Sequence, residues 1–136
     1  MPETDELLDA TTALIPPLLT ALDALRAAGR HMHPPMLAEL VDAIRPQHGG
    51  LVEGLMYLKN ATWPEHLETF VDCVNRSVGY ALRAFAQFEQ ALEAPQPAFI
   101  AYRAMGLTTK ATEALYPVAA MLPPVSRFYS RAPKPR

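Results

Sequence analysis

The chain has 136 residues, of which half are hydrophobic and 19% are charged, a balance that fits one globular domain with a core of its own. Its net charge of −2 argues against a nucleic-acid binder, which needs a concentrated basic surface. One cysteine excludes an internal disulfide, and the acidic start of the chain lacks the features of a signal peptide. We therefore expect a cytoplasmic protein, and no membrane span, because no proline-free run of about 18 uncharged apolar residues occurs.

The first predicted element is a helix over about residues 5–28, where leucines recur at helical spacing. Pro16 and Pro17 lie inside this stripe and remove two backbone donors, so we expect a kink or break near Ile15. A further helix is predicted from Pro34 until Pro46 stops it. Another begins near residues 49–50 and continues to about residue 61.

The clearest helix start in the sequence is Thr62-Trp63-Pro64-Glu65, which has the pattern of a capping box formed by Thr62 and Glu65. From residue 63 to about residue 94 the apolar residues share one side of a helix and the charged residues lie on the opposite side. This pattern predicts an amphipathic helix of about eight turns.

The last predicted helix covers residues 97–122, is bent at Pro117, and has only three charged residues, Arg103, Lys110 and Glu113. So few charges indicate a helix that is central or lies at an interface. Pro123 and Pro124 follow this helix, and residues 125–136 carry four positive charges and two further prolines. We therefore divide the chain into a helical domain over residues 1–124 and an extended basic tail or linker over residues 125–136.

These elements predict an all-α fold, a four- to five-helix bundle that is mostly up-and-down, with proline-kinked first and last helices.

No motif in the chain identifies a catalysed reaction, so we lean toward a protein that is not an enzyme, and we expect no cofactor. Di-iron bundles need Glu-x-x-His pairs, and none occurs. Phosphate loops, serine elbows and haem-attachment motifs are also absent. Cys73 follows Asp72 in the middle of a helix, which favours a small buried residue over a reactive thiolate.

His31 and His33 are the only histidines close together in the sequence, and they are weak candidates for a transition-metal site. Their spacing matches no known metal motif, so two solvated histidines between helices are the favoured interpretation.

Polar residues interrupt the apolar stripe of the long helix and suggest a pocket between it and the last helix. Such a pocket would take a small apolar molecule. An ordinary polar flank is the alternative. The candidate ligand-binding residues are Arg76, Tyr80, Arg83, Tyr102, Met105 and Tyr116.

The low charge of the last helix favours a different function, a non-catalytic interaction or accessory module. It would form a homodimer or dock on a larger protein partner, because contiguous exposed apolar surface usually marks an interface. The candidate interface residues are Leu115, Val118, Leu122, Phe128 and Tyr129. A small-molecule binder or compact enzyme that uses the pocket is the alternative function.

Overall fold

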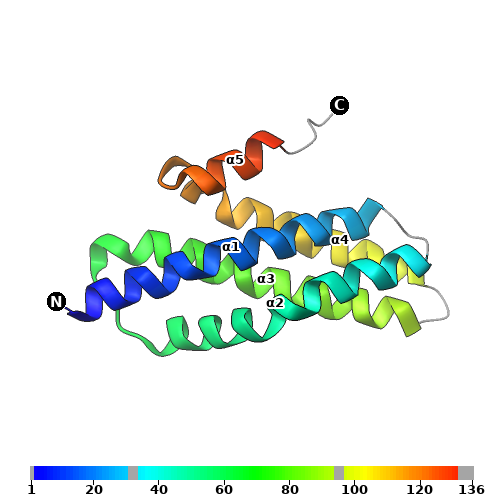
Figure 1. Ribbon diagram of the computed structural model, residues 1–136, viewed down its shortest axis with the longest axis horizontal. Helices are drawn as coiled ribbons and strands as arrows, with labels where there is room; N and C mark the ends of the chain where they lie inside the picture. The colour runs from blue at the N-terminus through cyan, green and yellow to red at the C-terminus, as the bar shows by residue number, and fades with distance from the viewer. Residues whose placement is uncertain (1, 31–33, 94–96, 132–136) are drawn as a thin grey trace.

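The computed structural model describes residues 2–30, 34–93 and 97–131, and these residues form helices joined by short connections (Figure 1). The elements are α1 (Pro2–Arg30), α2 (Pro34–Asn60), the 3-10 turn η1 (Glu65–Leu67), α3 (Glu68–Glu93), α4 (Pro97–Leu115), the 3-10 turn η2 (Tyr116–Ala120) and α5 (Pro123–Arg131). Helices α1 to α4 run alternately up and down, and α5 lies across one side of them. The prediction of an all-α bundle is confirmed.

The core follows from a seven-residue repeat that several helices share. In α3 the buried positions alternate in steps of four and three along its length, the spacing that keeps one stripe of a helix facing its neighbours. They are Phe70, Val74, Ser77, Ala81, Ala84, Phe88 and Ala91. In α4 the same steps connect Ala101, Ala104, Thr108, Ala111 and Leu115. Helices with this repeat pack at a shallow angle, as in most four-helix bundles.

α3 and α4 form the most extensive helix pair in the described part of the chain. Ser77 is buried and donates a hydrogen bond of 2.8 Å to the carbonyl oxygen of Ala111, which fixes the antiparallel register of the two helices. In this register Ala84 lies level with Ala104. The small side chains along both stripes allow the two backbones to approach closely, so little space is left between α3 and α4.

α1 continues through Pro16 and Pro17 without the break that we predicted. A proline in a helix costs about 3 kcal/mol through its missing donor and its steric clash. The residues on both sides of the pair are buried, and each contributes roughly 1.5–3 kcal/mol when removed from water. They are Leu14, Ile15, Leu18 and Leu19. Core packing on both sides of the prolines therefore outweighs their local cost.

α2 is likewise one helix where two were predicted. It contains Pro46 and passes through Gly49 and Gly50, neither of which adopts a positive φ. Its buried residues keep one stripe on both sides of the proline, at Leu37, Val41, Ile44, Leu51 and Leu58. Because both halves belong to the same core, a stop at Pro46 would expose one of them.

The predicted capping box is wrong, although a helical segment does begin at this place. Pro64 is the N-cap of η1, with an extended backbone and no side-chain capping bond, and Thr62 and Glu65 are both exposed. The Leu67 amide donates to the Pro64 carbonyl oxygen at 3.0 Å instead. One 3-10 turn thus precedes α3, which itself starts at Glu68.

The C-terminal region is more ordered than predicted. α4 ends at Leu115, and Pro117 lies in η2, in agreement with the expected bend. Residues 123–131 then form α5, so the prediction of an extended end is wrong for residues 125–131, and residues 132–136 lie outside the described part. α5 is helical because Val125 and Phe128, one turn apart, are both fully buried.

Among the described residues, one helical stretch is long and apolar enough to cross a membrane by length and composition alone, Leu8–Ala28 of α1, with a mean hydropathy of 1.2. A core helix passes the same test. Leu18, Leu22 and Leu25 of this stretch are fully buried against the rest of the bundle.

Candidate functional site

The first candidate site is a cavity of about 240 Å³ between α2 and α3, which we call the basic cavity. α2 contributes two of its residues and α3 contributes five. They are Leu55 and Lys59, and Asn75, Arg76, Gly79, Tyr80 and Arg83. Arg76, Tyr80 and Arg83 are spaced by four and three residues, so one face of α3 presents all three side chains.

Two cationic side chains lie near the ring of Tyr80 at the edge of this cavity. The Arg83 guanidinium lies 5.7 Å and the Lys110 ammonium 5.9 Å from the centre of the Tyr80 ring, both within range of a cation–π contact. Arg76 forms an ion pair of 3.6 Å with Asp72, one turn back on α3, and both side chains are more than half exposed. No carboxylate lines the cavity itself.

Three of the six predicted ligand-binding residues, Arg76, Tyr80 and Arg83, therefore lie together, but α2 and not α4 forms the opposite wall. The other three are on α4 or just after it. Tyr102 is 73% and Tyr116 62% exposed, and Met105 is half-buried. The pocket that we predicted between α3 and α4 therefore stays a prediction, and the cavity described here lies on the other side of α3.

The sequence interpretation missed Leu55 and Lys59, the residues that α2 adds to the cavity. Leu55 occupies the heptad position between Leu51 and Leu58, which are both buried, yet it stays half-buried. Gly54 accounts for the difference in part. A Cβ atom there would lie 2.9 Å from Cγ of Leu14, so the missing side chain allows α2 to lean on α1 at this point. An isolated glycine within a helical pattern was the available signal.

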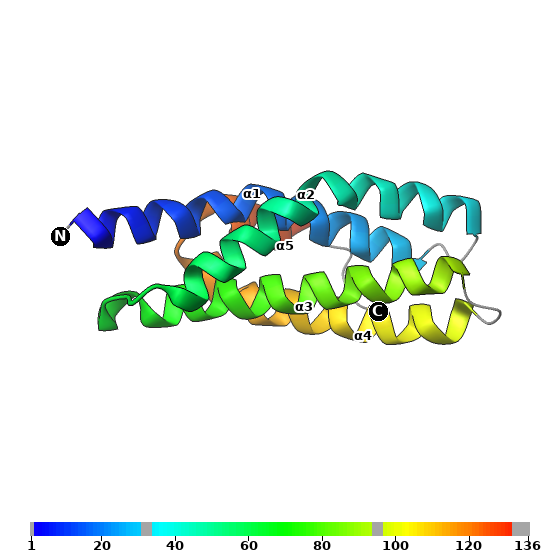
Figure 2. The same cartoon turned by 90° about the horizontal axis from the view of Figure 1, so that it is seen from below.

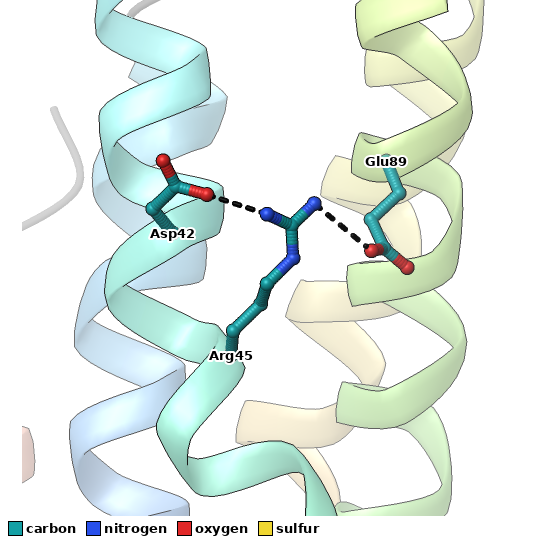
Figure 3. Close-up of polar contacts among 3 residues, drawn as sticks. All are labelled: Asp42, Arg45 and Glu89. Carbon is teal, nitrogen blue, oxygen red and sulfur yellow. Dashed lines mark hydrogen bonds and ion pairs between the residues drawn. The ribbon is translucent and has the colours of Figure 1, made fainter.

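A second hollow, of about 400 Å³, lies further along the same pair of helices, and its charges are compensated. Figure 3 shows Arg45 of α2 between two carboxylates, Asp42 on its own helix at 2.6 Å and Glu89 of α3 at 3.4 Å. Glu93 also lines this hollow. Arg45 thus links α2 to α3, and carboxylates of the same chain balance its positive charge.

The second candidate site is a surface along the outward side of α4 and η2, which we call the α4 outer face. Four of the eight large hydrophobic residues exposed in the described part of the chain belong to these two elements or, for Met121, to the residue directly after η2. They are Phe99 at 62%, Tyr102 at 73%, Tyr116 at 62% and Met121 at 50% exposure. α4 is therefore neither wholly central nor wholly solvated: it packs on α3 with one side and presents aromatic rings to solvent with the other.

The residues predicted to form the interface lie mostly inside the bundle. Leu115, Val118 and Phe128 are fully buried, and Leu122 and Tyr129 are half-buried. The Arg26 guanidinium lies 4.1 Å from the centre of the Phe128 ring, and the Tyr129 hydroxyl donates to the Thr112 carbonyl oxygen. The apolar surface of these residues thus holds α5 and η2 on the bundle, and it is not available to another molecule.

His31 and His33 lie outside the described residues. Within the described ranges, no group of three or more His, Cys, Asp or Glu side chains is arranged to hold a metal ion. Cys73 is buried, and burial together with the neighbouring Asp72 raises the pKa of its thiol. A raised pKa leaves the thiol protonated near neutral pH, which suits a packing role.

Comparisons of the chain with protein-family models, with curated proteins and with solved structures find no match.

Proposed function

We propose that this protein is a non-catalytic helical interaction module that pairs with a second copy of itself through the α4 outer face. The observation that carries the proposal is the gathering of exposed aromatic residues on this face. Phe99 and Tyr102 lie one turn apart on α4, and Tyr116 follows at the start of η2. Aromatic rings are enriched at protein interfaces because they bury large areas with few rotatable bonds.

The charges on the face support a second copy as the occupant. Arg103 and Lys110 bring positive charge and Glu113 brings negative charge, so the face is not dominated by one sign that would repel its copy. Gly106 lies between the two ends of the face, and a Cβ atom there would meet nothing within 4 Å. An open glycine at this place allows two helices to approach closely, as a symmetric pair requires.

The decisive measurement is the mass of the protein in solution, by light scattering coupled to size exclusion, over a range of concentrations. We expect a species of twice 15.0 kDa that dissociates on dilution. Tyr102→Glu should shift the equilibrium to the monomer, because it places a charge in the area that the dimer would bury.

Tyr57→Glu is the matched control, since Tyr57 is a 44% exposed tyrosine on α2, away from the α4 outer face. It should leave the dimer intact. A protein that is monomeric at every concentration would refute pairing with a second copy. Equal weakening by Tyr102→Glu and Tyr57→Glu would refute the choice of face.

A further inference from the structure

We infer that the basic cavity binds a small organic dianion, and that a phosphate monoester is its best chemical match. Three cationic side chains from two helices line this cavity without a carboxylate among them. A phosphate monoester carries a charge of about −1.5 to −2 at neutral pH and offers three oxygen acceptors. It can therefore meet Lys59, Arg76 and Arg83 at once, whereas a monocarboxylate has two oxygens and one charge.

The two arginines are available to such a ligand. Arg83 and Lys59 form no ion pair among the described residues, and Arg76 has one loose contact with Asp72, at 3.6 Å. A guanidinium presents its donors as a planar fork that suits phosphate oxygens. Tyr80 adds a hydroxyl group and an aromatic wall to the same face of α3.

The charge at this cavity is a local property rather than a general feature of the α2–α3 seam. The second hollow on the seam contains Arg45, which Asp42 and Glu89 neutralise. A solvated surface normally mixes both signs in this way. The basic cavity departs from that mixture, in a chain whose net charge is negative.

The size and lining of the cavity favour a small ligand. A volume of about 240 Å³ is below the roughly 300–1,000 Å³ of sites for drug-sized molecules. Leu55 contributes an apolar side chain to the lining, and a Cβ atom at Gly79 would meet nothing within 4 Å. A short carbon chain attached to the phosphate suits the Leu55 side chain and the open space at Gly79.

Asn75 provides a reason for a hydroxyl group on that carbon chain. Its Oδ1 atom is buried and accepts no hydrogen bond among the described residues, although the residue lines the cavity. A buried acceptor without a donor is costly. Rotation of the amide toward the cavity would give Oδ1 a ligand hydroxyl as its donor.

The test is isothermal titration of the intact protein with glycerol 3-phosphate, with inorganic phosphate and succinate as comparison anions, all at one ionic strength set with sodium chloride. We expect glycerol 3-phosphate to bind with one site per chain and more tightly than either comparison. Arg83→Gln and Lys59→Gln should each weaken binding by about tenfold, the loss of one charge-assisted hydrogen bond. Arg127→Gln, which removes an exposed cation from α5, should leave the affinity unchanged.

Gly79→Leu separates loss of the site from loss of the fold. Its side chain points into open space, so the melting temperature should be equal to or above that of the wild type while binding is abolished. Asn75→Leu should remove the preference for glycerol 3-phosphate over inorganic phosphate.

Three results would overturn the inference: no heat of binding at millimolar ligand, tighter binding of succinate than of glycerol 3-phosphate, or unchanged affinity in Gly79→Leu. The α2 wall of the cavity is away from the proposed dimer face, because α2 and α4 are not a packed pair and lie on opposite sides of α3 (Figure 2). Lys110 of α4 does lie near the Tyr80 ring, so the titration is repeated with Tyr102→Glu, and unchanged affinity in that variant separates ligand binding from dimer formation.

Discussion

Helix α3 packs against α4 and against α2 in different ways. Against α4 it presents small side chains in a continuous heptad stripe, and Ser77 is bonded directly to the α4 backbone. Its seam with α2 contains two hollows, and the exposed ion pair between Arg45 and Glu89 links the two helices there. One helix thus supplies a closed interface on one side and open space on the other.

The difference shows how a bundle of this size makes room for a site without weakening its core. Small residues favour close packing at α3–α4, whereas the two hollows described above lie along α2, where Gly54 allows the helix to lean on α1. Substitutions of the same kind should therefore have unequal effects on the two sides of α3.

The largest contrast is expected for leucine truncation. Leu115 of α4 is fully buried, so Leu115→Ala should lower the free energy of unfolding by about 3–5 kcal/mol through lost burial and a new cavity. Leu55 is half-buried beside an existing cavity, and Leu55→Ala should cost only about 1 kcal/mol. Urea unfolding followed by circular dichroism measures both values, and equal losses would break the comparison.

Enlarging a small residue of α3 should lower the stability on the α4 side and raise it on the α2 side. Ala84 is fully buried in the α3 stripe that packs on α4, and Ala84→Leu should destabilise the fold by about 1–3 kcal/mol through overpacking. Gly79→Ala fills open space in the middle of α3 and should stabilise it by up to about 1 kcal/mol. Thermal unfolding of the two variants side by side provides the test. A stabilising Ala84→Leu would mean that α3–α4 is not closed.

The closed side extends to α5 through Tyr129, whose hydroxyl donates to the Thr112 carbonyl oxygen of α4. Burial is the main cause that raises the pKa of Tyr129 in the folded protein. The stabilisation from the neutral hydroxyl is therefore present below about pH 10, the pKa of an unfolded tyrosine, and is lost as the pH rises above it.

Tyr129→Phe should cost about 1 kcal/mol at neutral pH, the value of one hydrogen bond. The difference in unfolding free energy between wild type and variant should shrink above pH 10. A difference that grows instead would mean that the pKa of Tyr129 is not raised.

Helical periodicity was sufficient to predict the all-α fold, because apolar stripes are a property of the sequence itself. It was not sufficient for helix ends. Pro46 ends an isolated helix, but in the bundle the residues on both sides of it belong to one core, and tertiary burial exceeds the local cost.

The candidate sites were only partly predictable for a related reason. Arg76, Tyr80 and Arg83 share a face of one helix, so the sequence could group them, but the identity of the opposite wall depends on how the helices pair. Leu115 and Phe128 were assigned to an interface on composition alone. Apolar residues in a helix with few charges can be buried against the same chain or against another, and the structure places these two in the core.

The contact between Gly54 and Leu14 couples two positions that are forty residues apart in the chain. Any side chain at position 54 meets the methyl end of Leu14, so a larger residue there requires a smaller or displaced one at position 14. Across the evolutionary history of this fold, the two positions should therefore change together, with glycine retained at 54 wherever a leucine is kept at 14.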